Sequence, residues 1–307
     1  MVDTHTVPLK ADAACRLMRQ ASLASMAVAL TLVAAKAVAW LVTDSVSMLS
    51  SLVDSSLDFV SSLITFIAVR QALMPADDDH RFGHGKAEAL SGVAQAGFIA
   101  ASAGGLVLTV GDRFLHPHTV QGEMVGVIVS GFAILLTLAL VSFQNYVLRR
   151  TGSIAIGADQ AHYTTDLVSN IAVGAGLFLS SRTGEPLIDL AVALALSAYL
   201  AFSAWQIGRV SIDVLMDREL PIEDRKRILD IVRQHPGVRN VHDLRTRSSG
   251  LTKFVQLHVV LQPTMSLGRA HVIGDTIEAA IQDDFPDTDV ILHIDPWNDD
   301  EPRLPPD

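Results

Sequence analysis

Long apolar stretches separated by short polar breaks fill the first two thirds of this 307-residue chain. A helix needs about 20 residues to cross the roughly 30 Å of bilayer hydrocarbon, and each stretch is long enough to do so. The breaks contain residues that commonly end helices, such as Pro, Gly and Asp. The pattern predicts an all-α membrane domain of six transmembrane helices over 21–209, preceded by an N-terminal cytoplasmic segment, 1–20. The predicted spans lie near 21–42, 45–70, 87–110, 124–148, 153–180 and 187–208.

The remainder of the chain, 210–307, consists of shorter segments, as expected for a soluble α/β domain. Its segments alternate between helical periodicity and the alternation typical of strands. The order α-β-β-α-β predicts a sheet covered on one face by two helices, a metallochaperone-like arrangement. The predicted helices are 222–234 and 267–285, and the predicted strands are 238–247, 253–261 and 289–294.

Lys and Arg are distributed unevenly between the two ends of the predicted spans. The side of a membrane protein that is richer in these residues usually faces the cytoplasm. We therefore expect a multi-pass protein of the cell inner membrane, with both termini and the 210–307 regulatory domain in the cytoplasm. One side collects Lys10, Arg16, Arg19, Arg70, Arg81, Lys86, Arg149 and Arg150, and the other has Arg113 and Arg182.

Composition narrows the chemistry of any bound group. The formal net charge is −10, and no basic patch indicates a nucleic-acid partner. The single cysteine, Cys15, excludes an intramolecular disulfide and a thiolate-rich metal cage. A bound metal must then be held by imidazole and carboxylate groups.

Three carboxylates and one imidazole lie inside two of the predicted spans. Asp54 and Asp58, and likewise His162 and Asp166, are spaced i, i+4, so each pair shares one helix face. A carboxylate in hydrocarbon costs at least about 2.5–3.5 kcal/mol, so such groups normally have partners and a function. Two facing helices would offer four ligands, the number that Zn²⁺ prefers. The alternative is pairing with a basic residue, but Lys36 alone cannot neutralise three acids and could instead snorkel outward.

Two further groups of His and Asp lie outside the predicted spans. A His-x3-His pair in the loop after the second span could close on one ion, and an ordinary hydrophilic loop explains these residues equally well. The histidines of the 210–307 domain fall on separate strands and a helix, so only the fold could bring them together. The loop group comprises Asp77, Asp78, Asp79, His80 and His84.

Taken together, these motifs closely resemble the cation diffusion facilitator family. They are the strings DSSLD at 54–58, PADDDHRFGHGKAE at 75–88, HYTTD at 162–166 and HIDP at 293–296. The likeness covers nearly the whole chain. It implies a homodimer that exchanges metal for protons by alternating access.

The resemblance also implies which residues bind metal. Some relatives carry a cysteine after the HxDP motif, where this chain has Trp297, which puts a thiolate ligand in doubt. Lys86 and Asp217 match family positions that form a charge cluster. The implied transport site is Asp54, Asp58, His162 and Asp166, the loop site is Asp77, His80 and His84, and the binuclear regulatory zinc site is His242, His258, His271, His293 and Asp295.

These observations predict a secondary active transporter, and not an enzyme, that exports Zn²⁺, Fe²⁺ or Cd²⁺ across the cytoplasmic membrane. Two other functions stay open. A membrane-embedded zinc hydrolase would need an open coordination position and a general base, and the chain has no HExxH motif. A membrane-tethered metal sensor would need only the soluble domain, which would leave the intramembrane acids without a purpose.

Overall fold

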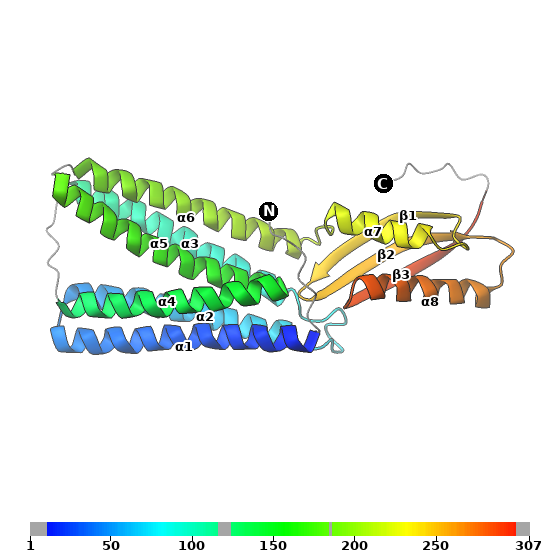
Figure 1. The fold of residues 1–307 in the computed structure, drawn as a ribbon, viewed down its shortest axis with the longest axis horizontal. Coiled ribbons are helices and arrows are strands. Elements are labelled where there is room, and N and C mark those ends of the chain that lie inside the picture. Colours follow the sequence, from blue (N-terminus) through cyan, green and yellow to red (C-terminus); the bar gives the residue numbers. More distant parts are fainter. Residues whose placement is uncertain (1–10, 116–123, 184–185, 299–307) are drawn as a thin grey trace. The chain divides into compact units, whose positions relative to one another are not determined.

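The computed structural model describes residues 11–115, 124–183 and 186–298 (Figure 1). The chain divides into two compact units, Met1–Ile212 and Asp213–Asp307. Residues 1–10 of the predicted N-terminal segment lie outside the described residues.

Six long helices make up the membrane part, as the apolar stretches predict. Each exceeds the roughly 20 residues that a membrane crossing requires. The first begins at Ala11, well before the apolar stretch, because the polar residues that precede this stretch continue the same helix. The helices are α1 (Ala11–Thr43), α2 (Val46–Ala72), α3 (Ala87–Leu115), α4 (Met124–Thr151), α5 (Ile154–Thr183) and α6 (Pro186–Leu215).

Helix α5 differs from the other five in composition. Within the described residues, α1, α2, α3, α4 and α6 are long and apolar enough to cross a membrane, and α5 falls short of that hydropathy. The reason is its polar content, which includes Asp159, His162 and Asp166. Such a helix is stable in a bilayer when its polar face is turned toward other helices.

The helices carry many apolar side chains on their outer surface and bury several polar side chains between them. Large apolar side chains such as Leu41, Leu108 and Trp205 are exposed, whereas Gln95 and Gln144 are buried. Water would disfavour an apolar surface of this extent, and lipid would not. The arrangement therefore fits a membrane bundle with polar groups among the side chains of its interior.

Helix packing brings α2 and α5 together. Helix α5 contacts α1, α2, α3 and α4, and α1 also packs against α2 and α4. A separate apolar cluster joins α3 to α6. Its buried members are Ile99, Ala103, Leu196, Leu200 and Ala204.

The second unit has the predicted α-β-β-α-β order. Its three-stranded sheet has the order β1-β2-β3, in which β1 runs antiparallel to β2 and β2 runs parallel to β3. A parallel neighbour needs a crossover connection, and α8 provides it between β2 and β3. The elements are α7 (Ile222–Arg233), β1 (Asn240–Ser249), β2 (Thr252–Leu261), α8 (Leu267–Asp284) and β3 (Thr288–Pro296).

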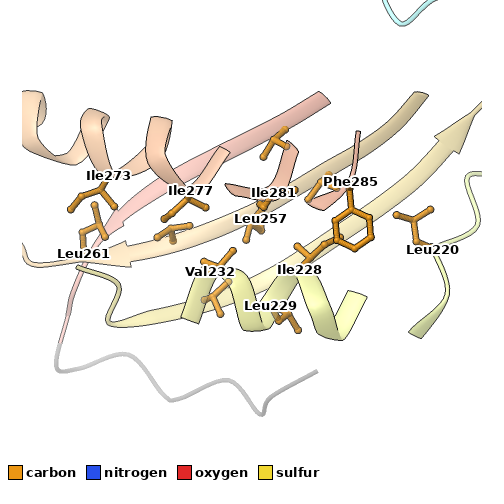
Figure 2. Packing of buried hydrophobic residues seen from close by; sticks show 14 of the residues in the cluster. Leu220, Ile228, Leu229, Val232, Leu257, Leu261, Ile273, Ile277, Ile281 and Phe285 are labelled. Carbon is orange, nitrogen blue, oxygen red and sulfur yellow. The ribbon is translucent and has the colours of Figure 1, made fainter. Parts of the chain in front are cut away.

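Both helices of this unit share one apolar core with the sheet (Figure 2). Ile228 of α7 and Ile277 and Ile281 of α8 are buried against Leu257 of β2. Alternate residues of a strand point to opposite faces. Because Leu257 faces the helices, its neighbour His258 lies on the other face of the sheet.

Candidate metal centres

The best-buried group of predicted ligands lies between α2 and α5. His162 Nε2 is 3.3 Å from Asp58 Oδ1 and 3.3 Å from Asp166 Oδ2. One ligand atom from each of the three residues lies within 4.8 Å of the others. His162 is 4% exposed, and its Nδ1 has no hydrogen-bond partner among the described residues. Two carboxylates thus converge on one imidazole nitrogen, an arrangement that suits either a proton or a metal ion between them.

The structure brings together three of the four predicted transport ligands. Asp54 is exposed on α2, one turn before Asp58, and is not part of the group of three. The i, i+4 spacing places Asp54 and Asp58 on one face of the helix, as predicted. Asp54 therefore lies next to this group without converging on His162.

Asp159 of α5 was not among the predicted site residues. It is fully buried, and its Oδ2 accepts hydrogen bonds from Ser25 Oγ of α1 and Gln144 Nε2 of α4, both at 2.6 Å. Its Oδ1 accepts a longer bond of 3.4 Å from Gln95 Nε2 of α3. One carboxylate thus ties four helices together, one turn before His162. The sequence signal was an acid inside an apolar stretch, the same signal that marked Asp54 and Asp58.

The loop between α2 and α3 brings its three predicted ligands together. Asp77 Oδ1 lies 3.3 Å from His80 Nδ1, and Asp77 Oδ2 lies 3.3 Å from His84 Nε2. The backbone N–H of His80 donates to Asp77 at 2.6 Å and holds the pKa of that carboxyl below its ordinary value. Of the other loop acids, Asp78 instead pairs with Arg81 at 3.0 Å.

Three histidines form a row across the strands of the C-terminal sheet. His242 of β1 pairs in register with His258 of β2, which pairs with His293 of β3. Asp295 lies among them, with its Oδ2 2.7 Å from His258 Nδ1 and 3.8 Å from His242 Nε2, and its Oδ1 3.2 Å from His293 Nε2. Ligand atoms of His242, His258 and Asp295 lie within 4.8 Å of one another.

His271 lies apart from this row. Its side chain is 75% exposed on α8, and its Nδ1 is 3.5 Å from Asp275. It is not part of the group formed by His242, His258 and Asp295 within the described chain.

Asp243 is a second carboxylate beside the histidine row that sequence reasoning missed. It occupies a β-bulge in β1 with a φ of 49°, and its Oδ2 lies 3.9 Å from His258 Nε2. A hydrogen bond from Arg245 holds the pKa of the Asp243 carboxyl below its ordinary value. A bulge re-aims side chains and cannot be placed from an alternating pattern alone.

The two residues of the predicted charge cluster belong to different units. Lys86 precedes α3, and Asp217 follows α6 with a φ of 56°. Asp217 is 3.3 Å from Arg247 of β1. The charge cluster itself stays a prediction.

Comparison with known proteins identifies the class that these features define. Residues 22–216 match the family profile described as the cation efflux transmembrane domain, and residues 220–297 match the profile described as the cytoplasmic domain of cation efflux proteins. The chain belongs to the cation efflux family, as its motifs predicted. It is a cation efflux transporter and not an enzyme, a multi-pass membrane protein with a cytoplasmic C-terminal domain.

Individual relatives are similar over almost the whole chain. The cation-efflux pump FieF of Klebsiella pneumoniae is 44% identical over 281 residues, which cover 92% of this chain and 93% of the relative. The pump of the same name from Escherichia coli strain K12 is 44% identical over the same shares. Among solved structures, CzrB in its Zn form is 28% identical and covers 28% of this chain and 99% of its own, with a TM-score of 0.27.

Proposed function

We propose that this protein exports divalent transition-metal ions, with Zn²⁺, Fe²⁺ or Cd²⁺ as cargo, in exchange for protons. The observation that carries the proposal is the convergence of Asp58 and Asp166 on His162 inside the helix bundle. Imidazole combined with carboxylate suits these ions. A cation in that group would attract Asp54 from the adjacent turn as a fourth ligand, which would complete the tetrahedral set that Zn²⁺ prefers.

Exchange for protons follows from the chemistry of the ligands. Carboxylates and imidazole bind a metal ion in their deprotonated forms, so loading from the cytoplasm releases protons. Protons arriving from the opposite side then displace the ion. Alternating access of the α2–α5 region to the two sides of the inner membrane, with both termini in the cytoplasm, would convert this competition into transport.

The cytoplasmic loop offers a second place for the cargo. Asp77, His80 and His84 supply three donors that already lie within 4.8 Å of one another, and two of them are exposed. We assign this group as a loop site that takes up the ion before transport. Its exposure favours fast exchange over tight binding.

The C-terminal domain would bind zinc as a regulator and form a homodimer. His242, His258 and Asp295 provide the donor types of a zinc site, and His293 lies beside them. Within one chain, the predicted ligand His271 lies outside that group. A second copy could bring His271 to it, so zinc bound there would hold two subunits together and favour transport.

Flux measurements in proteoliposomes test the transport proposal. Vesicles that enclose a zinc-sensitive dye should show zinc entry coupled to proton movement in the opposite direction. Asp54→Ala and Asp58→Ala should each reduce the flux at least about tenfold, as expected when a metal ligand is lost. The matched control is Asp289→Asn, which changes an exposed acid of β3. Normal flux in Asp54→Ala would refute the four-ligand site, and zinc binding without flux would favour a metal sensor.

Metal preference tests the role of the imidazole separately. Replacing His162 with Asp makes the donor set entirely oxygen, which favours harder ions such as Mn²⁺. His162→Asp should therefore transport Mn²⁺ better relative to Zn²⁺ than the wild type does. An unchanged ratio of the two transport rates would contradict the assignment of His162 as a ligand.

A further inference from the structure

Lys36 of α1 is directed toward α2 and does not extend along its own helix toward the end of the bundle. Its Nζ donates to Ser55 Oγ at 2.6 Å and to the backbone carbonyl of Ser51 at 3.3 Å. Ser55 is 1% exposed, and Lys36 itself is half-buried. The ammonium is thus held by two acceptors inside the contact between α1 and α2, in place of the outward snorkelling that the sequence left open.

These acceptors lie on the face of α2 that carries the transport carboxylates. Ser51 and Ser55 are spaced i, i+4, as are Asp54 and Asp58, and at 3.6 residues per turn the four positions fall within roughly 100° of arc on one side of the helix. Burial disfavours the charged form of Lys36, and the negative charges of Asp58, Asp54 and Asp166 favour it. It is therefore a neighbour of the acid group without being one of its metal donors.

The count of charges at the transport site explains why a lysine lies beside it. The carboxylates of Asp54, Asp58 and Asp166 carry three negative charges once they are deprotonated for metal binding. A divalent ion neutralises two of these charges, and neutral His162 adds none. One negative charge would remain in a membrane interior, where an uncompensated charge is costly. The ammonium of Lys36 supplies the missing positive charge.

We propose that Lys36 is the resident counter-ion of the transport site and sets the site to accept a cation of charge +2. When the ion is bound, Lys36 compensates the third carboxylate. Because it also repels the ion, it weakens binding and speeds release on the far side. Lys36 is a specificity-determining residue in this scheme, and the scheme rests on the transport function proposed above.

Ser55 gives the counter-ion a fixed place. An ammonium has three N–H groups, and Ser55 and Ser51 accept two of the hydrogen bonds that Lys36 can donate. This anchoring keeps the positive charge near the carboxylates while the ion enters and leaves. A lysine that moved away could not compensate the carboxylate charge both with and without the bound ion.

The test compares variants of the full-length protein in proteoliposomes, with Zn²⁺ as the transported ion. Lys36→Met keeps the length and apolar stem of the side chain but removes the charge, and Lys36→Arg keeps the charge. We expect Lys36→Met to lower the apparent KM for Zn²⁺ about tenfold and to lower the maximal rate by a similar factor, since tighter binding slows release. Lys36→Arg should stay close to the wild type in both parameters.

A merely structural role of Lys36 predicts a different result. If Lys36 had only a structural role, Lys36→Met would have a lower maximal rate without a lower KM for Zn²⁺. Any result in which KM is not lowered overturns the proposal. Should Lys36→Met fail to fold, Lys36→Gln decides by the same KM criterion, because it removes the charge and keeps a hydrogen-bond donor on the side chain. Absence of metal-for-proton exchange in the wild type would defeat the transport proposal itself. Normal wild-type exchange with an unchanged KM in the uncharged variants would defeat only the counter-ion.

Discussion

Replacing Asp159 with alanine removes a carboxylate that joins α5 to α1, α3 and α4. In the wild type, Ser25 Oγ and Gln144 Nε2 each donate to Asp159 Oδ2 at 2.6 Å, and Gln95 Nε2 donates more weakly to Oδ1 at 3.4 Å. In Asp159→Ala, these donors lose this acceptor and a small cavity replaces the side chain, while Gln95 Nε2 keeps its bonds to Ser61 O and Thr65 Oγ1.

The loss of stability depends on whether each donor finds another hydrogen-bond acceptor. The Ser25 hydroxyl can turn to Ser62 Oγ, which already lies 3.0 Å away, so its loss is small. Gln144 is fully buried, and Asp159 is the acceptor that the described residues offer its Nε2, so its amide N–H would be left buried without this bond. A buried donor without an acceptor costs about 1–3 kcal/mol, which gives a total of about 2–4 kcal/mol for Asp159→Ala. Asp159→Asn keeps one oxygen for the two short bonds and should cost about 1 kcal/mol.

Thermal unfolding of the purified protein in detergent measures the difference in stability between the variants. The fraction that remains folded after heating is monitored by size-exclusion chromatography. For Asp159→Ala we expect the apparent melting temperature to fall by roughly 5–15 °C, and for Asp159→Asn by a few degrees at most. Ser142→Ala is the control, because this exposed hydroxyl of α4 bonds only to its own helix. An Asp159→Ala protein that melts within about 2 °C of the wild type would show that the carboxylate does not hold these helices together.

Two further predictions concern helix packing and acid sensitivity. A Cβ at Gly92 of α3 would lie 2.1 Å from Ser211 Oγ, so Gly92→Ala should destabilise the protein by about 1–3 kcal/mol in the same melting assay. A Cβ at Gly97 would meet nothing within 4 Å, so Gly97→Ala should not destabilise the protein. Equal melting temperatures of the two variants would contradict the close contact between Gly92 and Ser211. The pKa of Asp243 is lowered by Arg245, so this pair stabilises the domain fully above the ordinary value of about 3.9, and the contribution is lost as the pH falls through the folded pKa. An NMR titration should show the Asp243 carboxyl titrating at higher pH in Arg245→Gln, and an unchanged midpoint would contradict the role of the guanidinium.

The sequence predicted the elements of both units because each leaves a local signal. A long apolar stretch reports a membrane helix directly, and alternation with turns reports the strands of the C-terminal domain. The start of α1 at Ala11 left no such signal, since polar residues extend a helix beyond the apolar part without changing the hydropathy pattern.

Contacts between elements were harder to predict than the elements. The i, i+4 spacing told which residues share a helix face, but the rotation of α2 against α5 decides that Asp58, and not Asp54, approaches His162. Asp159 could be noticed as an acid in an apolar stretch, yet its donors come from three other helices that no local pattern connects. Likewise, the row from His242 to His258 depends on strand register, which a sequence pattern does not fix.

A helix as polar as α5 would enter lipid poorly if it were made alone, because Asp159 and His162 would face hydrocarbon until partners arrived. The order of the chain removes this difficulty. The helices that donate to Asp159 all precede α5, so they leave the ribosome first and are available when α5 emerges. The order of synthesis is then part of the folding mechanism, and a circular permutant that began with α5 would have to insert its most demanding helix without help.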